Sequence, residues 1–413
     1  MLGSFSSSHE EEEDPSDLQY QIPQPSRAFS PPAIQMRQLL ISCAELVSQS
    51  DFSAARRLLS ILSSNSSPFG DSTERLVHQF STALSLRLSR YATPATSSGA
   101  MSASANTAAA DSEAFHSTYL SLNQITPFIR FSQLTANQAI LEAIEGQRAI
   151  HILDFDILHG VQWPPLMQAI AERCGNLHPP PMIRITGTGE DLGILQRTGD
   201  RLLKFAQSLG LKFQFHPLLL RNDPTSVPLY LPSALQLLPD ETLAVNCVLY
   251  LHRLLKDDSR DLRLFLHKIK AMEPKVVTIA EREANHNHPL FLQRFVEALD
   301  HYTAVFDSLE ATLPPTSRER LAVERIWFGR EIVDIVSAEG DNRRERHERF
   351  ESWEVMLRSS GFSNVPLSPF ALSQAKLLLR LHYPSEGYRL QIINDSFFLG
   401  WQNQALFSVS SWH

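Results

Sequence analysis

The sequence predicts an α/β protein whose mostly parallel sheet ends in an antiparallel hairpin and carries an α-helical cap. Apolar residues recur with a helical period over residues 36–146. From residue 147, short apolar runs alternate with helical stretches, which is typical of βαβ units and therefore of a parallel sheet. Residues 388–412 contain strand-like runs without a helix between them, which indicates a closing antiparallel hairpin.

Residues 1–35 differ from the rest of the chain in composition and charge. They hold seven Ser, five Pro and six acidic side chains against one Arg, so five of the eight net negative charges belong to them. Such a segment cannot bury enough apolar surface to offset its ordering entropy, so we expect a disordered tail. The remainder is nearly neutral, which argues against a protein that coats nucleic acid through a strongly basic surface.

Residues 36–146 are expected to form the mainly helical cap. Asp51 is a predicted N-cap for the second helix, and Asp71 with Glu74 forms a predicted capping box for the third. Residues 92–112 hold 16 Ala, Ser or Thr among 21 residues and are expected to be a flexible insert. Helices are expected to resume at residue 115.

The α/β core is expected over residues 147–413. The strands predicted before the hairpin are 150–155, 182–186, 211–215, 242–249 and 276–280. Residues 314–360 are expected to be an extra helical insertion after the fifth strand. Five β/α units closed by a hairpin resemble the class I methyltransferase-like variant of the Rossmann-like fold.

Cysteine content and hydropathy indicate the cellular environment. The three cysteines are widely spaced and form no CxxC pair, so a disulfide scaffold or structural zinc site is not expected and a reducing compartment fits. No window holds about 18 consecutive apolar residues, so we expect no membrane-spanning helix and no membrane partner. The first residues lack the basic and apolar regions of a signal peptide. We therefore expect a soluble intracellular protein.

The loop after the first predicted strand bears on cofactor binding. In the methyltransferase fold this strand ends in an acid followed by alternate glycines, because the backbone passes close to the cofactor. Here Asp156 and Leu158 occupy two of the glycine positions, where they would crowd and repel the ligand, and only Gly160 is kept. We expect no cofactor. An S-adenosylmethionine-dependent methyltransferase-like enzyme remains the alternative, by analogy of fold alone.

Other sequence patterns give only weak indications of a metal site or a catalytic site. His286 and His288 with Glu281 and Glu283 could supply metal ligands, but two histidines on a loop after a strand are more often hydrogen-bonding residues. Neither a GxSxG elbow nor a recognisable cysteine nucleophile is present. We expect no metal, no catalytic residue and no enzymatic activity.

An LxxLL element follows the fourth predicted strand. It consists of Leu251, Leu254 and Leu255, which fall on one helical face and could fill a groove on a coregulator. The alternative interpretation is the inward face of a helix. Residues 318–349 hold eight Arg and eight acidic side chains, a balance that indicates a salt-bridged helical surface rather than a phosphate-binding stripe.

A series of ordered motifs resembles the plant GRAS family of transcription regulators over residues 36–413. The VHIID motif of that family resembles Ile150, His151, Ile152, Leu153 and Asp154, continued by Gly160, Gln162 and Trp163. Its LRITG element resembles residues 183–187, which include Arg184. Its PFYRE and SAW regions resemble stretches that contain Gly329, Arg330 and Glu331, and then Trp401 and Trp412.

The resemblance implies a nuclear protein that controls transcription through other transcription factors or coregulators. It also allows a homodimer or heterodimer, and direct DNA binding in a groove between cap and core, for which Arg184 and Arg282 are the candidates. The variable residues 1–5 resemble the branch of the family that promotes axillary meristem formation, and so shoot branching.

Overall fold

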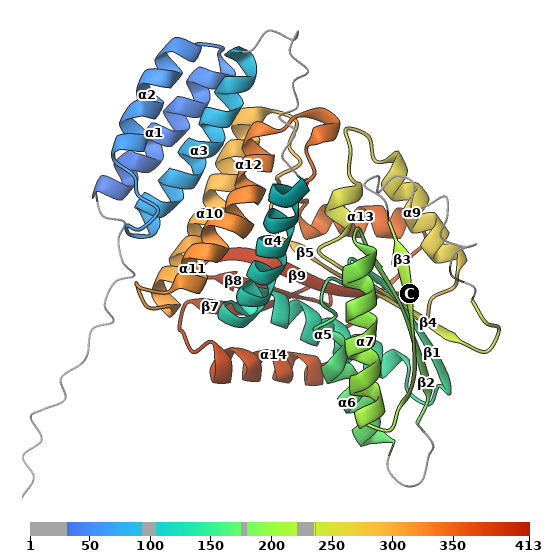
Figure 1. Cartoon of the computed structure of the whole chain (residues 1–413). Helices are drawn as coiled ribbons and strands as arrows, with labels where there is room; N and C mark the ends of the chain where they lie inside the picture. The colour runs from blue at the N-terminus through green and yellow to red at the C-terminus, as the bar shows by residue number, and fades with distance from the viewer. Residues whose placement is uncertain (1–30, 93–104, 175–179, 221–234, 236) are drawn as a thin grey trace, which may run out of the picture.

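The computed structural model describes residues 31–92, 105–174, 180–220, 235 and 237–413 (Figure 1). Most of the expected acidic tail therefore lies outside the described residues, as do residues 93–104 of the expected flexible insert. No helix in the described ranges is long and apolar enough to cross a membrane.

Three N-terminal helices pack together as a bundle at one end of the molecule (Figure 1): α1 (Pro31–Ser48), α2 (Phe52–Ser64) and α3 (Ser72–Ala92). The predicted caps are present. Asp51 accepts a backbone N–H at 3.0 Å, and Asp71 and Glu74 make the two reciprocal bonds of a capping box at 2.9 and 3.2 Å. The boundary of the tail is wrong, because α1 begins at Pro31. Proline suits a first helical turn, since the N–H that it lacks would be unpaired there.

Helix α4 (Ala105–Ile125) begins inside the segment that we expected to be flexible. That prediction is wrong for residues 105–112, and the reason is their alanine content, because alanine is the strongest helix former. Helix α5 (Pro127–Ala143) follows, and it packs on the sheet instead of joining the bundle. The division of the chain into a cap over 36–146 and a core over 147–413 stays a prediction.

The strands of the described residues form one sheet in the order β3-β2-β1-β4-β5-β9-β8-β7, with β6 on β9. Neighbours from β3 to β5 are parallel, and the pairs from β5 through β7 are antiparallel. This arrangement confirms the predicted fold class. The strands are β1 (Ala149–Phe155), β2 (Met182–Gly189), β3 (Lys212–Leu219), β4 (Thr242–Val248), β5 (Val276–Arg282), β6 (Asn364–Val365), β7 (Tyr388–Ile393), β8 (Ser396–Trp401) and β9 (Gln404–Trp412).

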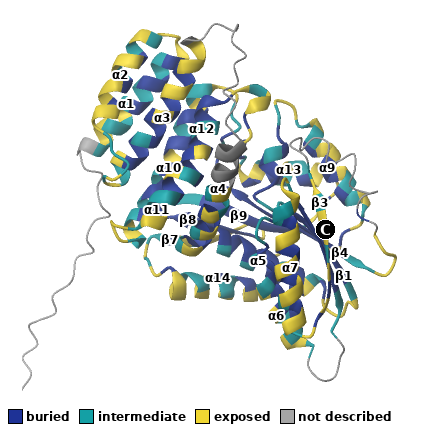
Figure 2. Cartoon of the chain, viewed as in Figure 1, coloured by how far each residue is buried: buried dark blue, intermediate teal, exposed yellow. Residues whose placement is uncertain are grey.

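Helices cover both faces of the sheet. One face packs on α5, α6 (Trp163–Arg173) and α7 (Leu192–Ser208), and the other on α9 (Arg260–Ala271) and α13 (Phe350–Ser359). Successive strand side chains alternate between the two faces, as strand geometry requires. In β1, Ile150 and Ile152 belong to the first layer, and Leu153 and Phe155 belong to the second. Because both faces are covered, the central strands are buried along their length (Figure 2).

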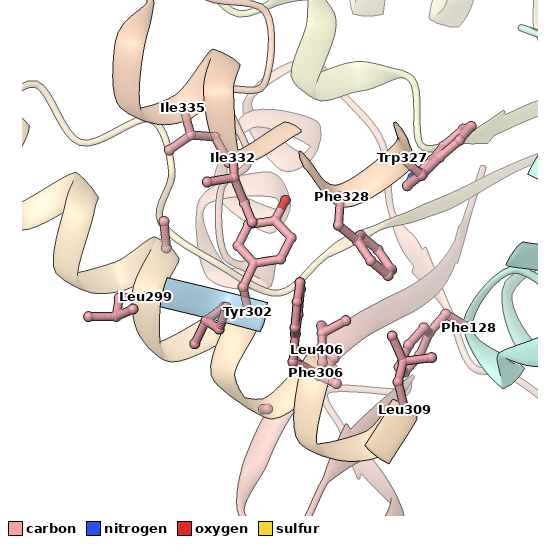
Figure 3. Packing of buried hydrophobic residues seen from close by; sticks show 14 of the residues in the cluster. Phe128, Leu299, Tyr302, Phe306, Leu309, Trp327, Phe328, Ile332, Ile335 and Leu406 are labelled. Atoms are coloured by element: carbon pink, nitrogen blue, oxygen red, sulfur yellow. The ribbon is translucent and has the colours of Figure 1, made fainter. Parts of the chain in front are cut away.

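A third apolar cluster joins the N-terminal bundle to the sheet. Helices α10 (Phe291–Thr312) and α12 (Gly329–Ser337) lie between α3 and the antiparallel strands (Figure 1). Tyr302, Phe306 and Leu309 of α10 pack with Phe328, Ile332 and Leu406 (Figure 3). The expected helical insertion contains α11 (Arg318–Ala322), the π-helical turn η3 (Val323–Phe328), α12, η4 (Gly340–Asn342) and α13. Helix α14 (Pro369–His382) then packs against α5.

The closing strand β9 yields a prediction about stability. Trp412 is fully buried in the layer under α13, so Trp412→Ala should lower the free energy of unfolding by about 3–5 kcal/mol. The matched control is Ile392→Ala on β7, whose side chain is 56% exposed and should cost less than about 1 kcal/mol. Urea unfolding monitored by circular dichroism measures both. Equal effects of the two substitutions would contradict the role assigned to β9.

Candidate functional site

A cavity of about 580 Å³ opens at the carboxyl ends of the parallel strands. This edge is where ligands bind in open α/β sheets. The loops after β1, β2 and β4 and the end of β5 form its floor, and α4, η3, α12 and residues 344–347 form its wall. The ionisable side chains that line it are His116, Asp156, Glu190, Asp191, His252, Arg253, Arg282, Arg330, Glu331, Asp334, Arg344, Glu345 and His347.

The loop after β1 has a glycine-like backbone without the glycines. Asp156, Leu158 and Gly160 have φ values of 63°, 46° and 63°, in the left-handed region that favours glycine. Backbone N–H groups of the loop donate to Thr188 of β2 at 2.9 and 3.0 Å and hold it in place. The loop therefore follows a path suited to a closely approaching ligand, but it carries side chains into that space.

Those side chains fill the position expected for a methyltransferase cofactor. The Asp156 carboxylate pairs with the Arg253 guanidinium across the end of the sheet. Next to this pair, Asp154, Leu158 and Trp327 line a remaining cavity of about 30 Å³, which holds about one water molecule. The residues present here do not fit S-adenosylmethionine, since the Asp156–Arg253 pair stands at the strand end and its carboxylate would face the cofactor.

A buried polar network lies directly below this loop. Asp154 accepts hydrogen bonds from the Trp163 indole N–H at 2.9 Å and the Asn246 amide at 2.7 Å. Gln162 donates to Asn246 at 3.0 Å, and Thr278 donates to the same amide oxygen at 2.9 Å. The network connects β1, β4, β5 and the start of α6, so Asp154, Gln162 and Trp163 of the family motif have structural contacts rather than chemical roles.

Arg184, expected in a DNA groove, is in fact buried. Its guanidinium pairs with Glu241 and contacts His151 Nδ1 at 3.2 Å, while His151 Nε2 lies 2.8 Å from the Thr186 hydroxyl. Burial, together with the Arg184 charge, lowers the pKa of His151 to about 4. Arg184 is only 3% exposed, so its assignment to a phosphate-binding groove is wrong.

Arg282 lies on the cavity wall but is already neutralised. Its guanidinium pairs with Glu331 of α12, whose other oxygen accepts from the Tyr302 hydroxyl at 2.8 Å. Burial raises the pKa of Glu331, and the Arg282 charge opposes that shift. Arg282 is 1% exposed, so this pair fastens α12 to β5 and does not present a cation to DNA.

The LxxLL element is also buried. Leu251, Leu254 and Leu255 are at most 4% exposed, and the turn η2 (Leu251–Leu254) packs them in the layer under α9. They cannot enter a groove on a coregulator in this structure, so that interpretation is wrong and the inward-facing alternative holds. The LxxLL spacing puts the three leucines on one face of the element, and in this buried turn that face points into the core.

The remaining family-motif residues occupy packing positions. A Cβ atom on Gly329 would lie 2.7 Å from the Gln79 side chain, so this glycine allows α12 to approach α3 closely. Arg330 is exposed and lies over the Phe115 ring at 4.9 Å. The apolar rings of Trp401 and Trp412 are buried in two different layers.

A cluster that the sequence did not predict lies on the same cavity wall. His252 of η2 and His347 both face Glu345, and Glu281 of β5 bonds to His252. The histidines considered from the sequence behave differently. His288 accepts a backbone N–H, and the carboxylate of Glu283 accepts the N–H of Phe350. Spacing could not reveal the cluster, because the fold alone brings its members together.

A separate hollow of about 430 Å³ lies between α1, α3, α10 and the turn that joins β8 to β9. Its walls are mainly apolar, and its ion pair, Arg37 with Asp300, is partly exposed. It lacks converging ionisable groups of the kind found at the sheet edge.

The chain is similar to known proteins both in sequence and in structure. The sequence model of the GRAS domain family matches residues 36–413. Scarecrow-like protein 18 of Arabidopsis thaliana is 56% identical over 404 residues, covering 91% of each chain. Protein MONOCULM 1 of Oryza sativa subsp. japonica is 48% identical over 399 residues, covering 91% of this chain and 88% of that one. The crystal structure of SCL7 from Oryza sativa superposes with a TM-score of 0.76 at 34% identity, over 93% of this chain and all of that one.

The buried Asp154 predicts a specific pH dependence. Burial raises its pKa to about 7 from an ordinary value of 3.8, although Asn246 and Trp163 oppose the shift. Between about pH 4 and 7 the folded chain keeps a proton that the unfolded chain releases, so stability should fall as pH rises. The contribution is about 1.4 kcal/mol per pH unit in mid-window.

Asp154→Asn removes this titration at nearly constant size. Unfolding free energies measured at several pH values should therefore show a shallower decline for the variant than for the unsubstituted chain between pH 4 and 7. The difference between the two slopes isolates Asp154 from the other groups that titrate in this range. Parallel slopes would show that Asp154 is ionised in the folded protein throughout.

Proposed function

We propose that this chain, which belongs to the GRAS domain family, is a nuclear regulator of transcription that promotes the formation of axillary meristems and shoot branches. The family and its relatives establish the coarser statement: the chain is a GRAS regulator of plant development and transcription, and it is not an enzyme. The 48% identity to protein MONOCULM 1, together with the resemblance of residues 1–5 to the branch of the family that promotes axillary meristems, supports the narrower role.

One observation carries the proposal that the chain works through protein partners. The cavity at the carboxyl ends of the strands, where a Rossmann-like enzyme would bind its ligand, is lined by six carboxylates and four guanidinium groups. Several of these groups pair with one another, as Asp156 does with Arg253 and Arg282 with Glu331. A lining with excess negative charge repels DNA phosphates, and the internal pairs replace a bound substrate. Other transcription factors or coregulators are therefore the proposed partners, whether in a heterodimer or with a second copy of the chain.

The nuclear role can be tested in a plant that lacks its Lateral suppressor-type gene. The chain should restore axillary buds, because its action is on transcription. A fusion to an active nuclear export signal should abolish the rescue, whereas the same fusion with an inactivated signal should not. Bud number per node and accumulation of each fusion protein are the measurements. Rescue by the exported protein, or failure of the unmodified protein to rescue while it accumulates in nuclei, would contradict the proposal.

Direct DNA binding is a second candidate function, and a different surface favours it. A hollow of about 460 Å³ between α3 and α12 is lined by Arg90, Arg325 and Arg330 against one carboxylate, Asp334. These three arginines are exposed, unlike Arg184 and Arg282. Exposed guanidinium groups are suited to phosphate contacts, which give an affinity that falls steeply with salt.

This candidate predicts a measurable salt effect. The double substitution Arg325→Ala/Arg330→Ala should weaken DNA binding and reduce the slope of log affinity against log salt by about 2. Arg260→Ala is the control, because Arg260 is exposed and lies on α9, outside the hollow between α3 and α12. Mobility-shift titrations at several salt concentrations measure the slopes. The same slope for the double variant and the unsubstituted chain would remove this surface from consideration.

A further inference from the structure

Three side chains from two distant segments meet on the wall of the sheet-edge cavity. His252 follows β4 in η2, while Glu345 and His347 lie between η4 and α13. The Nε2 atoms of His252 and His347 lie 3.3 and 3.2 Å from the same carboxylate oxygen of Glu345. All three potential ligand atoms lie within 4.8 Å of one another.

The two imidazole nitrogens that face Glu345 lie at ion-pair distance from its carboxylate oxygen but make no well-aligned hydrogen bond among the described residues. Both side chains are at most 2% exposed, so water does not satisfy these nitrogens from bulk solvent. Buried polar atoms are usually paired, and an unpaired one calls for an explanation such as an ion. Two such atoms that converge on one carboxylate oxygen form a position that suits a cation.

The outer contacts of the histidines are compatible with metal binding through their Nε2 atoms. The Nδ1 atom of His252 lies 2.7 Å from the Glu281 carboxylate, which can only accept, so this nitrogen carries a proton. The Nδ1 atom of His347 lies 2.9 Å from Nδ1 of His286. If His347 donates in that contact, its Nε2 presents a lone pair. A carboxylate behind a histidine is the usual outer arrangement around a protein-bound metal.

Two of the three separations between the potential ligand atoms fit tetrahedral coordination, and the third is below 4.8 Å. Bonds of about 2.0–2.1 Å from zinc to nitrogen or oxygen place neighbouring ligand atoms about 3.3 Å apart. The two measured separations, 3.2 and 3.3 Å, agree with this value. Two carboxylates, Glu281 and Glu345, balance a doubly charged ion, while the nearby Arg253 and Arg282 are paired with Asp156 and Glu331.

We propose that His252, Glu345 and His347 bind a divalent transition-metal ion, with zinc as the preferred ion, and leave a fourth coordination position open to the cavity. The ion would tie η2 to the segment before α13. Its open position would accept water or a side chain that enters the cavity, and all three residues line that cavity. This site uses neither the residues of the family motifs nor the contacts argued for DNA, so it stands independently of the proposed function.

The test uses the full chain after removal of metal with a chelator. Titration with Zn²⁺ against a chromophoric chelator should show one tight equivalent, and Co²⁺ should give the visible absorption of a tetrahedral site. His252→Gln, Glu345→Gln and His347→Gln should each abolish the tight equivalent. His288→Gln, on the neighbouring loop but outside the cluster, is the matched control and should bind like the unsubstituted chain.

A second variant separates a metal site from a merely structural cluster. Glu281→Gln keeps all three ligands but weakens the partner of His252, so Zn²⁺ affinity should fall by about 10–100-fold without loss of the equivalent. Circular dichroism verifies that each variant is folded. The proposal is overturned if the folded, unsubstituted chain binds no stoichiometric Zn²⁺, or if Glu345→Gln binds it as tightly. Either result would mean that His252 is instead a cation held between Glu281 and Glu345.

Discussion

The hydrogen bonds of one buried row of residues hold the sheet, its helices and the cavity in register. Asp154, Asn246 and Thr278 are direct neighbours on β1, β4 and β5, and their side chains point to the same face. Trp163 and Gln162 close the network from the start of α6. A carboxylate buried at this depth is tolerated only with such partners, because an unpaired polar group in the interior is costly. The network therefore fixes where α6 begins and how the loop after β1 leaves the sheet.

That loop keeps the backbone of a ligand-binding strand end while its own side chains stand where a ligand would approach. Asp156 and Leu158 adopt the left-handed backbone that glycines usually supply, at a cost in strain of about 1–3 kcal/mol each. Their neighbours offset this strain, since Thr188 accepts two backbone N–H groups of the loop and Arg253 pairs with the added carboxylate. The glycine-like backbone geometry is kept, whereas charged side chains of the protein itself line the cavity in front of the strand end.

Local patterns predicted the fold well, but contacts between distant segments escaped them. The alternation of strands and helices, the capping box at Asp71 and the C-terminal hairpin depend on residues close in sequence, so periodicity and spacing were sufficient. The predicted DNA contacts of Arg184 and Arg282 were wrong, because the residues around an arginine in a strand do not show which distant glutamate will pair with it in the interior. The same limit applies to the LxxLL element that begins at Leu251. Its spacing occurs both in docking motifs and in turns whose leucines face the interior, so spacing alone does not distinguish them. His252 and Glu345 meet only through the sheet order and the insertion, so sequence could not pair them.

The ion pairs at the sheet edge also limit where a partner can bind. Arg282 with Glu331 links β5 to α12, and Arg253 with Asp156 links the turn after β4 to the loop after β1. Removing one member of a buried pair leaves an uncompensated charge, which is strongly destabilising. If the cavity widened, as the site of a substrate-binding enzyme does, these paired charges would be separated. The walls of the cavity therefore resist such a motion. Contacts that change with the partner are therefore expected on exposed side chains such as Arg325 and Arg330, where binding requires no rearrangement of the interior.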